Sequence, residues 1–148
     1  MSATNAFETA ILNLTFANAN AANIGDATGL RGSTTAGNFW ISLHTADPGE
    51  TGNQTTSEAT YTGYARVSVA RSGAGFTISG NNCSNAAAVT FGTCTAGANT
   101  ITHFGIGSDS SGTGNLFFKG SLTSPSSLAV SAGITPSFGI GELDVTAE

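Results

Sequence analysis

The sequence predicts a mostly β protein: an antiparallel β-sandwich or jelly-roll-like domain with one N-terminal helix and an extended arm. Two observations predict this class, namely short segments of alternating apolar and polar residues and turn-forming residues that separate them at nearly regular spacing. A chain of 148 residues suffices for one core and would leave two domains small. We expect residues 1–37 to form the helix and arm, and residues 38–148 to form the sandwich as one folding unit.

A helix is predicted over residues 4–17. Large apolar residues recur there at helical spacing on one face: Phe7, Ile11 and Leu14. Alanines complete the same face: Ala3, Ala10 and Ala17. Asn5 followed three residues later by Glu8 is a candidate capping pair for the first turn.

Small and polar residues dominate residues 18–37, where Ile24 and Leu30 are the apolar anchors. Such a composition predicts a long arm or loop. Long connections without regular structure usually have a function, and a helix with an arm suits attachment to a neighbouring subunit. A loop packed on its own domain is an equally open interpretation.

From Asn38 onward the hydrophobic period changes to two. In the first strand we expect three inward side chains, Phe39, Ile41 and Leu43, and three outward ones, Trp40, Ser42 and His44. In residues 64–71 we expect Ala65, Val67 and Val69 inward, and Arg66, Ser68 and Ala70 outward. Further strands are predicted at residues 76–79, 87–91, 100–106, 115–122, 128–130 and 142–146.

An outward Trp40 beside a polar rim is typical of protein contact surfaces, although the same side chain would also fit under the N-terminal helix. The sequence therefore offers five candidate partner-contact residues, from the helix and the first strand. They are Phe7, Ile11, Leu14, Trp40 and His44.

The charge balance disfavours two classes of partner. Four Lys and Arg residues stand against nine Asp and Glu residues, whereas nucleic-acid binding and membrane-surface binding need clustered basic side chains. No apolar stretch approaches the roughly 20 residues of a membrane helix, and the N-terminus lacks the pattern of a signal peptide. We expect no nucleic-acid or membrane partner, and assembly in a host cytoplasm.

We predict no catalytic, cofactor or metal site. A nucleophile–base pair needs Ser or Cys beside a His that a carboxylate orients, and no motif of this kind surrounds His44 or His103. The window from Asp47 to Glu58 imitates a calcium-binding loop, but Gly49 and Thr51 stand where ligands belong. Two further side chains, Cys83 and Cys94, are predicted to be free thiols, because a strand separates them.

Several segments together resemble a family of small tailed-phage virion proteins. The most specific is Leu-His-Thr-Ala-Asp-Pro-Gly at residues 43–49. The others follow in the family's order: residues 64–67, Arg71, residues 84–85, 89–91, 102–106 and 133–136. The resemblance covers roughly residues 38–146, and it implies a non-catalytic particle component with a β-sandwich body.

Within that family we expect a capsid decoration (cement) protein on the capsid exterior, which ties major capsid protein subunits together and self-associates as a trimer or dimer. The scarcity of charge fits attachment through apolar area and β-edges. One alternative is a tail, tail-fibre or baseplate component. Another is a host-glycan adhesion module that uses Trp40, Tyr61 and Tyr64.

Overall fold

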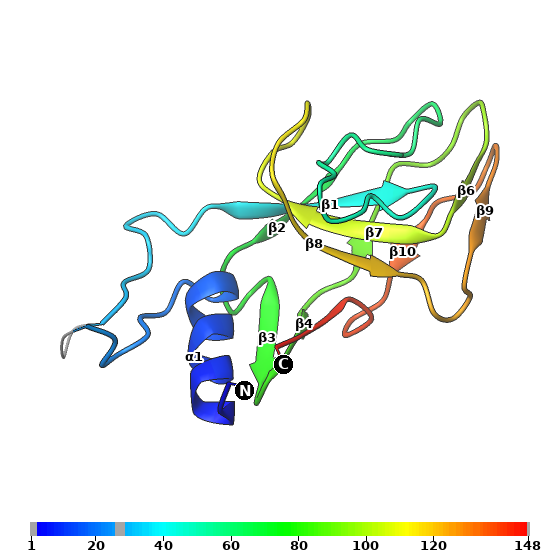
Figure 1. Ribbon diagram of the computed structural model, residues 1–148. Coiled ribbons are helices and arrows are strands. Elements are labelled where there is room, and N and C mark those ends of the chain that lie inside the picture. The colour runs from blue at the N-terminus through cyan, green and yellow to red at the C-terminus, as the bar shows by residue number, and fades with distance from the viewer. Residues whose placement is uncertain (1–2, 26–28, 148) are drawn as a thin grey trace. The chain divides into compact units, whose positions relative to one another are not determined.

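The computed structural model describes residues 3–25 and 29–147, and it confirms the predicted class: mostly β, antiparallel sheets and an N-terminal helix (Figure 1). In chain order the elements are α1 (Asn5–Phe16), β1 (Asn38–His44), β2 (Val67–Ala70), β3 (Phe76–Ser79), β4 (Asn82–Asn85), β5 (Val89–Thr90), β6 (Asn99–Ile101), β7 (His103–Gly107), β8 (Leu116–Ser121), β9 (Leu128–Val130), β10 (Ser137–Phe138) and β11 (Asp144–Thr146). In the described chain no helix is long and apolar enough to cross a membrane.

The chain forms two compact units that are interleaved in sequence. The first unit comprises Met1–Asn38, Ala70–Ala88 and Phe138–Glu148, and the second comprises Phe39–Val69 and Val89–Ser137. The N-terminal helix thus shares a unit with later strands. We predicted a boundary between residues 37 and 38, with residues 38–148 as one folding unit. That this segment folds as one unit stays a prediction.

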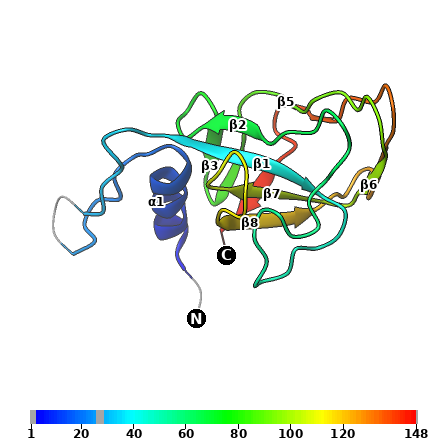
Figure 2. The ribbon, with the colours of Figure 1, turned by 90° about the horizontal axis from the view of Figure 1, so that it is seen from above.

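The second unit is built on a four-stranded sheet with the order β2-β1-β7-β8. The strands β1, β7 and β8 lie side by side with β7 in the middle (Figures 1 and 2), and both ladders between them are antiparallel. A two-stranded sheet of β6 and β9 also belongs to this unit, and a second two-stranded sheet pairs β5 with β10, which lies at the boundary of the unit. One face of the large sheet packs large apolar side chains in the core: Phe39, Ile41, Leu43, Phe104 and Ile106.

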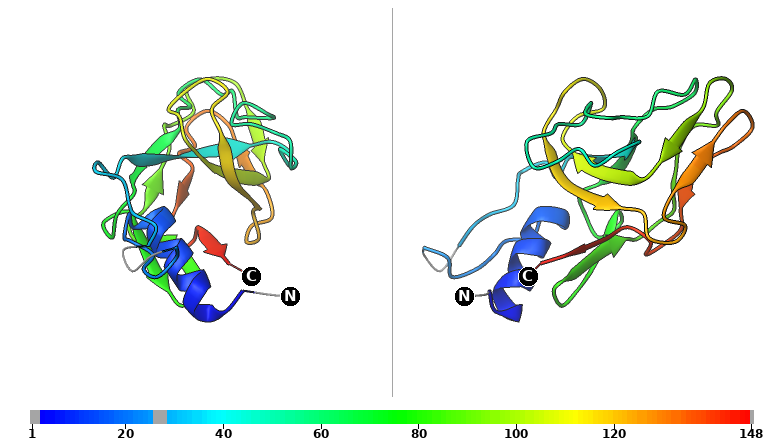
Figure 3. Two further views of the ribbon diagram at one scale, coloured as in Figure 1. Left: turned by 60° about the vertical axis from the view of Figure 1, so that its left-hand side comes forward. Right: turned by 45° about the vertical axis from the view of Figure 1, so that its right-hand side comes forward.

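The first unit packs α1 against a three-stranded antiparallel sheet of order β11-β4-β3 (Figure 3). Its core contains Phe16 and Phe76, whose ring centroids lie 4.9 Å apart in an edge-on arrangement. Asn85 is buried there, and its side chain donates to the carbonyls of Ala87 and Gly139 and accepts from the amide of Leu143. These bonds attach the C-terminal segment to β4.

The helix agrees with the predicted span but not with the predicted cap. Thr4 is the N-cap residue, and its side chain makes no capping bond, so the pair of Asn5 and Glu8 proposed from the sequence is wrong. Asn5 is already helical, and Glu8 lies on the buried side. At the other end Arg71 donates to the carbonyls of Leu14 and Thr15, which satisfies acceptors left open by the last turn.

The arm folds back on itself rather than running straight. Ala21 and Leu30 exchange two backbone hydrogen bonds, at 2.8 and 2.9 Å. Asn18 fixes Ser33 through its side chain, which accepts from the Ser33 amide and donates to the Ser33 carbonyl. Arg71 also reaches the arm, at the carbonyl of Ala36.

Strand predictions succeed where apolar residues alternate and fail where they are absent. The predictions for β3 and β9 match the observed bounds, while the segment predicted over residues 100–106 is two strands, β6 and β7. The pattern does not predict β4, whose Asn-Cys-Ser-Asn sequence lacks β-favouring side chains, or β10, which has two residues. Pairing with neighbouring strands, rather than local propensity, holds both in place.

Candidate functional site

Both faces of β1 are buried, which corrects part of the prediction for this strand. Phe39, Ile41 and Leu43 face the apolar core as expected. Ser42 and His44 were predicted to face outward, but both have 0% exposure. His44 is therefore not available to a partner at the surface, and its place among the contact residues is wrong.

Two glycines on β7 make room for these polar side chains. In the antiparallel register Ser42 lies opposite Gly105, and Trp40 lies opposite Gly107. A β-carbon at Gly105 would come within 2.7 Å of the Ser42 hydroxyl and 2.8 Å of His44 Nε2. One at Gly107 would come within 2.2 Å of the Gln54 side chain. Because Gly105 and Gly107 have no side chains, the polar groups of Ser42, His44 and Gln54 can lie directly against β7.

His44 is held by two hydrogen bonds. Nδ1 lies 2.8 Å from the carbonyl of Thr56, which only accepts, so the ring proton sits on Nδ1. Nε2 lies 2.8 Å from the Ser42 hydroxyl and accepts its proton. Burial, the largest cause, lowers the pKa of His44 below its ordinary value, which favours this neutral form.

The loop after β1 folds back over this face of the sheet. The amide of Thr45 donates to the carbonyl of Ser57, and the amide of Ala59 donates to the carbonyl of Leu43. At the tip of the loop, the Asn53 side chain accepts from the amide of Thr55. The Leu-His-Thr-Ala-Asp-Pro-Gly segment therefore forms the end of β1 and the start of a loop that covers its own strand.

Gln54 joins this loop to the turn between β7 and β8. It is fully buried, and its side-chain amide makes a reciprocal pair with Asp109: Oε1 accepts from the Asp109 amide at 2.9 Å, and Nε2 donates to its carbonyl at 3.3 Å. The backbone N–H of Gln54 also donates to the carbonyl of Thr113. The hydrogen bonds of Gln54 therefore connect two loops that are not paired as strands.

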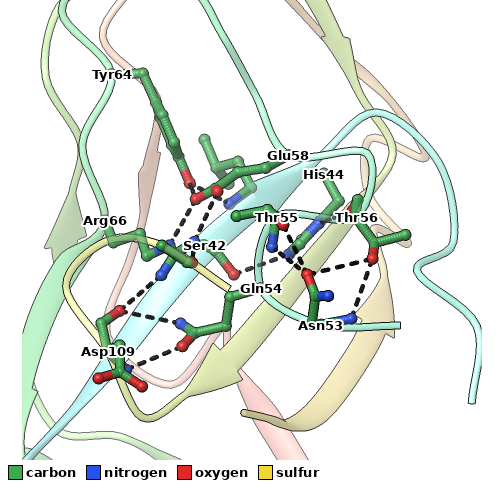
Figure 4. Close-up of polar contacts among 12 residues, drawn as sticks. Ser42, His44, Asn53, Gln54, Thr55, Thr56, Glu58, Tyr64, Arg66 and Asp109 are labelled. Carbon is green, nitrogen blue, oxygen red and sulfur yellow. Dashed lines mark hydrogen bonds and ion pairs between the residues drawn. The ribbon is translucent and has the colours of Figure 1, made fainter. Parts of the chain in front are cut away.

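A buried ion pair completes the connection (Figure 4). Arg66 donates to both carboxylate oxygens of Glu58, at 2.7 and 2.8 Å, and to the carbonyls of Asp109 and Gly112. The Tyr64 hydroxyl donates to Glu58 as well. The Glu58 carboxylate raises the pKa of Arg66, and burial raises the pKa of Tyr64. Arg66 was predicted to face outward, and that prediction is wrong.

We call these seven residues the polar cluster: Ser42, His44, Gln54, Glu58, Tyr64, Arg66 and Asp109. Across the described residues, no buried side-chain nitrogen or oxygen lacks a hydrogen-bond partner. Ser42 and His44 have the spacing of a nucleophile and its base, but a carbonyl stands where a carboxylate would orient the ring. Because both side chains have 0% exposure, a substrate cannot reach them in this conformation. The hydrogen bonds and the ion pair of the polar cluster hold two loops against the sheet.

In the segment that resembles a calcium-binding loop, the carboxylates of Asp47 and Glu58 each pair with a basic side chain. Glu58 is engaged by Arg66, whereas Asp47 accepts from the amide of Gly49 and pairs with Lys119 at 3.0 Å. The two carboxylates thus belong to separate interactions. Among the residues that the structure describes, no group of three or more His, Cys, Asp or Glu side chains is placed to hold a metal ion.

The other predicted contact residues remain accessible. Phe7 is 50% exposed, and Ile11, Leu14 and Trp40 are partly exposed. Their role at a partner surface stays a prediction. The aromatic platform suggested for glycans is different, since Tyr61 is 3% exposed and bonded to the Gly92 carbonyl, and the Tyr64 hydroxyl is bonded to Glu58.

The two cysteines are free thiols, as predicted, and the structure shows that both are buried. Burial raises the pKa of Cys83 to about 12, which keeps this thiol protonated and unreactive. The Cys94 thiol points its hydrogen at the carbonyls of Ala96 and Gly97. Both thiols therefore serve as small core groups.

Sequence reasoning missed most of the polar cluster. Gln54, Glu58 and Asp109 lie in loops, where polar residues are expected to be solvated. One signal was available: Gly105 and Gly107 alternate within a strand, and glycine inside a strand often marks the close approach of another group. What approaches was not visible in the local pattern.

The fold is an antiparallel β-rich body, and among the described residues its buried side-chain polar atoms all have hydrogen-bond partners. In the comparison with protein families, residues 2–146 match the family described as Podophage GP4 fiber I protein gp80. The chain belongs to this family, and it is a structural protein of the phage virion. A search of curated proteins found no match.

Proposed function

We propose that this chain is a non-catalytic component of a phage tail fibre or of the tail structure that bears one. The observation that supports this most directly is the match of residues 2–146 to a family described as a fiber protein. The capsid decoration role that we expected from the sequence has less support, because that description refers to a fibre rather than to a capsid.

The geometry of the polar cluster fits a particle component. Arg66, Gln54 and Glu58 fix two long loops to one sheet through bonds that are shielded from solvent. Such bonds are little affected by salt, since screening acts mainly on exposed charges. A virion protein has to keep its shape outside the cell, where ionic strength varies.

The copy number per virion tests the position on the particle. Quantitative mass spectrometry of purified particles, with the major capsid protein as internal standard, is expected to give a number typical of tail parts, about six to a few dozen. Hundreds of copies, together with labelling of the capsid exterior by antibody, would instead establish the decoration role with the major capsid protein as partner.

The non-catalytic part of the proposal has its own test. Purified protein is expected to turn over neither ester nor glycoside substrates, because the Ser42–His44 pair is enclosed. Turnover that disappears in His44→Gln, while the variant keeps its far-UV spectrum, would contradict the proposal. Fibre position and lack of catalysis are thereby tested separately.

A further inference from the structure

The loop that follows β1 is held on the sheet mainly by polar contacts. We call residues 45–57 of this loop the flap. Within the flap, all of whose residues the structure describes, Pro48 and Gln54 alone are buried. A segment that buries few apolar side chains can open locally at a low cost in free energy while the rest of the protein stays folded. The flap is therefore a candidate for local opening.

Two groups of contacts tie the flap to the second unit without involving His44. The Gln54 side chain bonds to the turn between β7 and β8. The carboxylates of Asp47 and Glu50, which are exposed, pair with Lys119 at 3.0 and 3.2 Å. The bond from the Gly49 amide, and then Lys119, lower the pKa of Asp47. Asp47 therefore keeps its charge and its partner over the pH range in which a histidine titrates.

The third contact depends on the protonation state of His44. Its Nδ1 donates to the carbonyl of Thr56 in the flap, and its Nε2 accepts from the Ser42 hydroxyl (Figure 4). A protonated ring carries hydrogens on both nitrogens, so Ser42 can no longer donate to it. Protonation therefore leaves the hydroxyl hydrogen without its acceptor in an enclosed site, where Ser42 and His44 both have 0% exposure.

The groups around His44 do not compensate for a positive charge on its ring. The titratable and charged groups on the elements packed around it are Glu58, Tyr64, Arg66, His103 and Lys119. Both carboxylate oxygens of Glu58 already accept from Arg66, which adds a positive charge of its own. His103, opposite His44 in the register with β7, supplies no negative charge. The enclosed site therefore favours the neutral ring.

From this geometry we infer that the flap is an acid-sensitive lid, which opens locally as one segment and takes up a proton at His44 as it opens. Opening breaks the bond to Thr56 and brings the ring into water, where its charged form is stable. The ladder between β1 and β7 contains no flap residue and stays paired. Ser57, at the end of the flap, has a φ of +54°, a left-handed conformation that is strained for a residue other than glycine. Opening releases this strain.

The direction of the pH dependence follows from the two states of the flap. In the closed state burial lowers the pKa of His44, whereas the hydrated ring of the open state titrates near the ordinary value of 6.5. The open state therefore binds the proton more tightly. The equilibrium constant for opening rises as the pH falls from about 6.5 toward the pKa of the closed state, by at most about tenfold per pH unit. A virion component with such a lid changes its surface in mild acid without losing its fold.

Amide hydrogen exchange of the full chain, followed by NMR between about pH 7.5 and about pH 5, measures the opening. The backbone N–H of Gln54 is the reporter, because it bonds to Thr113 outside the flap. After correction for the intrinsic exchange rate, we expect this amide to be at least about tenfold less protected than the amides of β1 and β7 at every pH. Its protection is expected to fall below pH 6.5 with a slope of at most one proton.

Three variants separate His44 from other causes. His44→Gln is expected to remove the pH dependence of the amide at position 54. His103→Gln changes the other histidine of the chain, so it is the matched control and is expected to keep the dependence. Gln54→Ala removes the side-chain tie to Asp109, and it is expected to increase opening at neutral pH while the pH dependence remains. The backbone N–H at position 54 is present in all three variants and serves as the same reporter.

Three results would overturn the inference. A wild-type Gln54 amide as well protected as the amides of β1 and β7 would show that the flap does not open by itself. Protection of this amide that stays constant in the wild type over the whole pH range would exclude proton uptake on opening. A pH dependence that persists in His44→Gln, or that disappears in His103→Gln, would assign the proton to another residue.

Discussion

The polar cluster and Phe7 of α1 each reverse the usual distribution of residues. In the second unit, a serine, a histidine and an ion pair are buried over a sheet. In the first unit, the side chain of Phe7 on α1 is 50% exposed to solvent. The difference lies in partners: the buried polar groups find theirs within the chain, whereas half of the Phe7 side chain stays in contact with solvent. Burial alone therefore does not follow from whether a side chain is polar or apolar.

The strongest way to test this comparison is to remove one member of the ion pair. Arg66→Ala leaves the Glu58 carboxylate, whose side chain is 15% exposed, without its guanidinium, and we expect a loss of about 3 kcal/mol in the free energy of unfolding, the low end for a buried pair. Urea unfolding followed by fluorescence gives the value. Lys119→Ala, which removes an exposed ion pair to Asp47, is the control and is expected to cost less than about 1 kcal/mol. Equal losses in the two variants would contradict the assignment of Arg66 to the interior.

The second prediction concerns Gly105, whose missing side chain leaves space for the polar cluster. Gly105→Ala pushes a methyl group against Ser42 and His44, and it should destabilise the protein by about 1–3 kcal/mol through overpacking. Gly73→Ala has open space around the added carbon and serves as the matched substitution. If both variants unfold at the same urea concentration, the loop over β7 is looser than the structure shows.

We expect acid to lower the stability of the protein through protonation of His44 in the polar cluster. Because burial lowers the pKa of His44 below 6.5, the unfolded chain takes up a proton at this residue before the native protein does. The stability that follows is fully present above pH 6.5 and is lost as the pH falls through the native pKa. Comparing urea midpoints at neutral and mildly acidic pH, we expect a steeper decline for the wild type than for His44→Gln. Parallel declines would show that His44 is not desolvated.

The smallest effect is expected for Phe7 on α1. Phe7→Gln keeps a good helix former and removes an exposed ring, so the free energy of unfolding should change by no more than about 0.5 kcal/mol. Thermal unfolding at low protein concentration measures it without a contribution from association. A loss of several kcal/mol would mean that Phe7 supports its own unit, and that the two regions differ less than proposed.

Local pattern predicted much of the fold but little of the polar cluster. The helix at residues 4–17, the strand at 38–44 and its inward residues Phe39, Ile41 and Leu43 follow from periodicity, and the structure agrees. The inward and outward assignment failed at Ala65, which is exposed, and at Arg66, which is buried, because β2 begins only at Val67 and the preceding residues follow the loop. Periodicity reports where side chains alternate, and it does not report what covers each side.

The sequence by itself determined the mostly β class, the helix near the start, the two free thiols and the scarcity of charge that favours a structural role. Those properties depend on composition and on contacts between residues close in the chain. Only the tertiary structure decided that Gln54 meets Asp109, which is 55 residues later, and that Arg66 reaches Gly112, which is 46 residues later. Such pairs have no local signature, since their stability comes from removing two distant segments from water together.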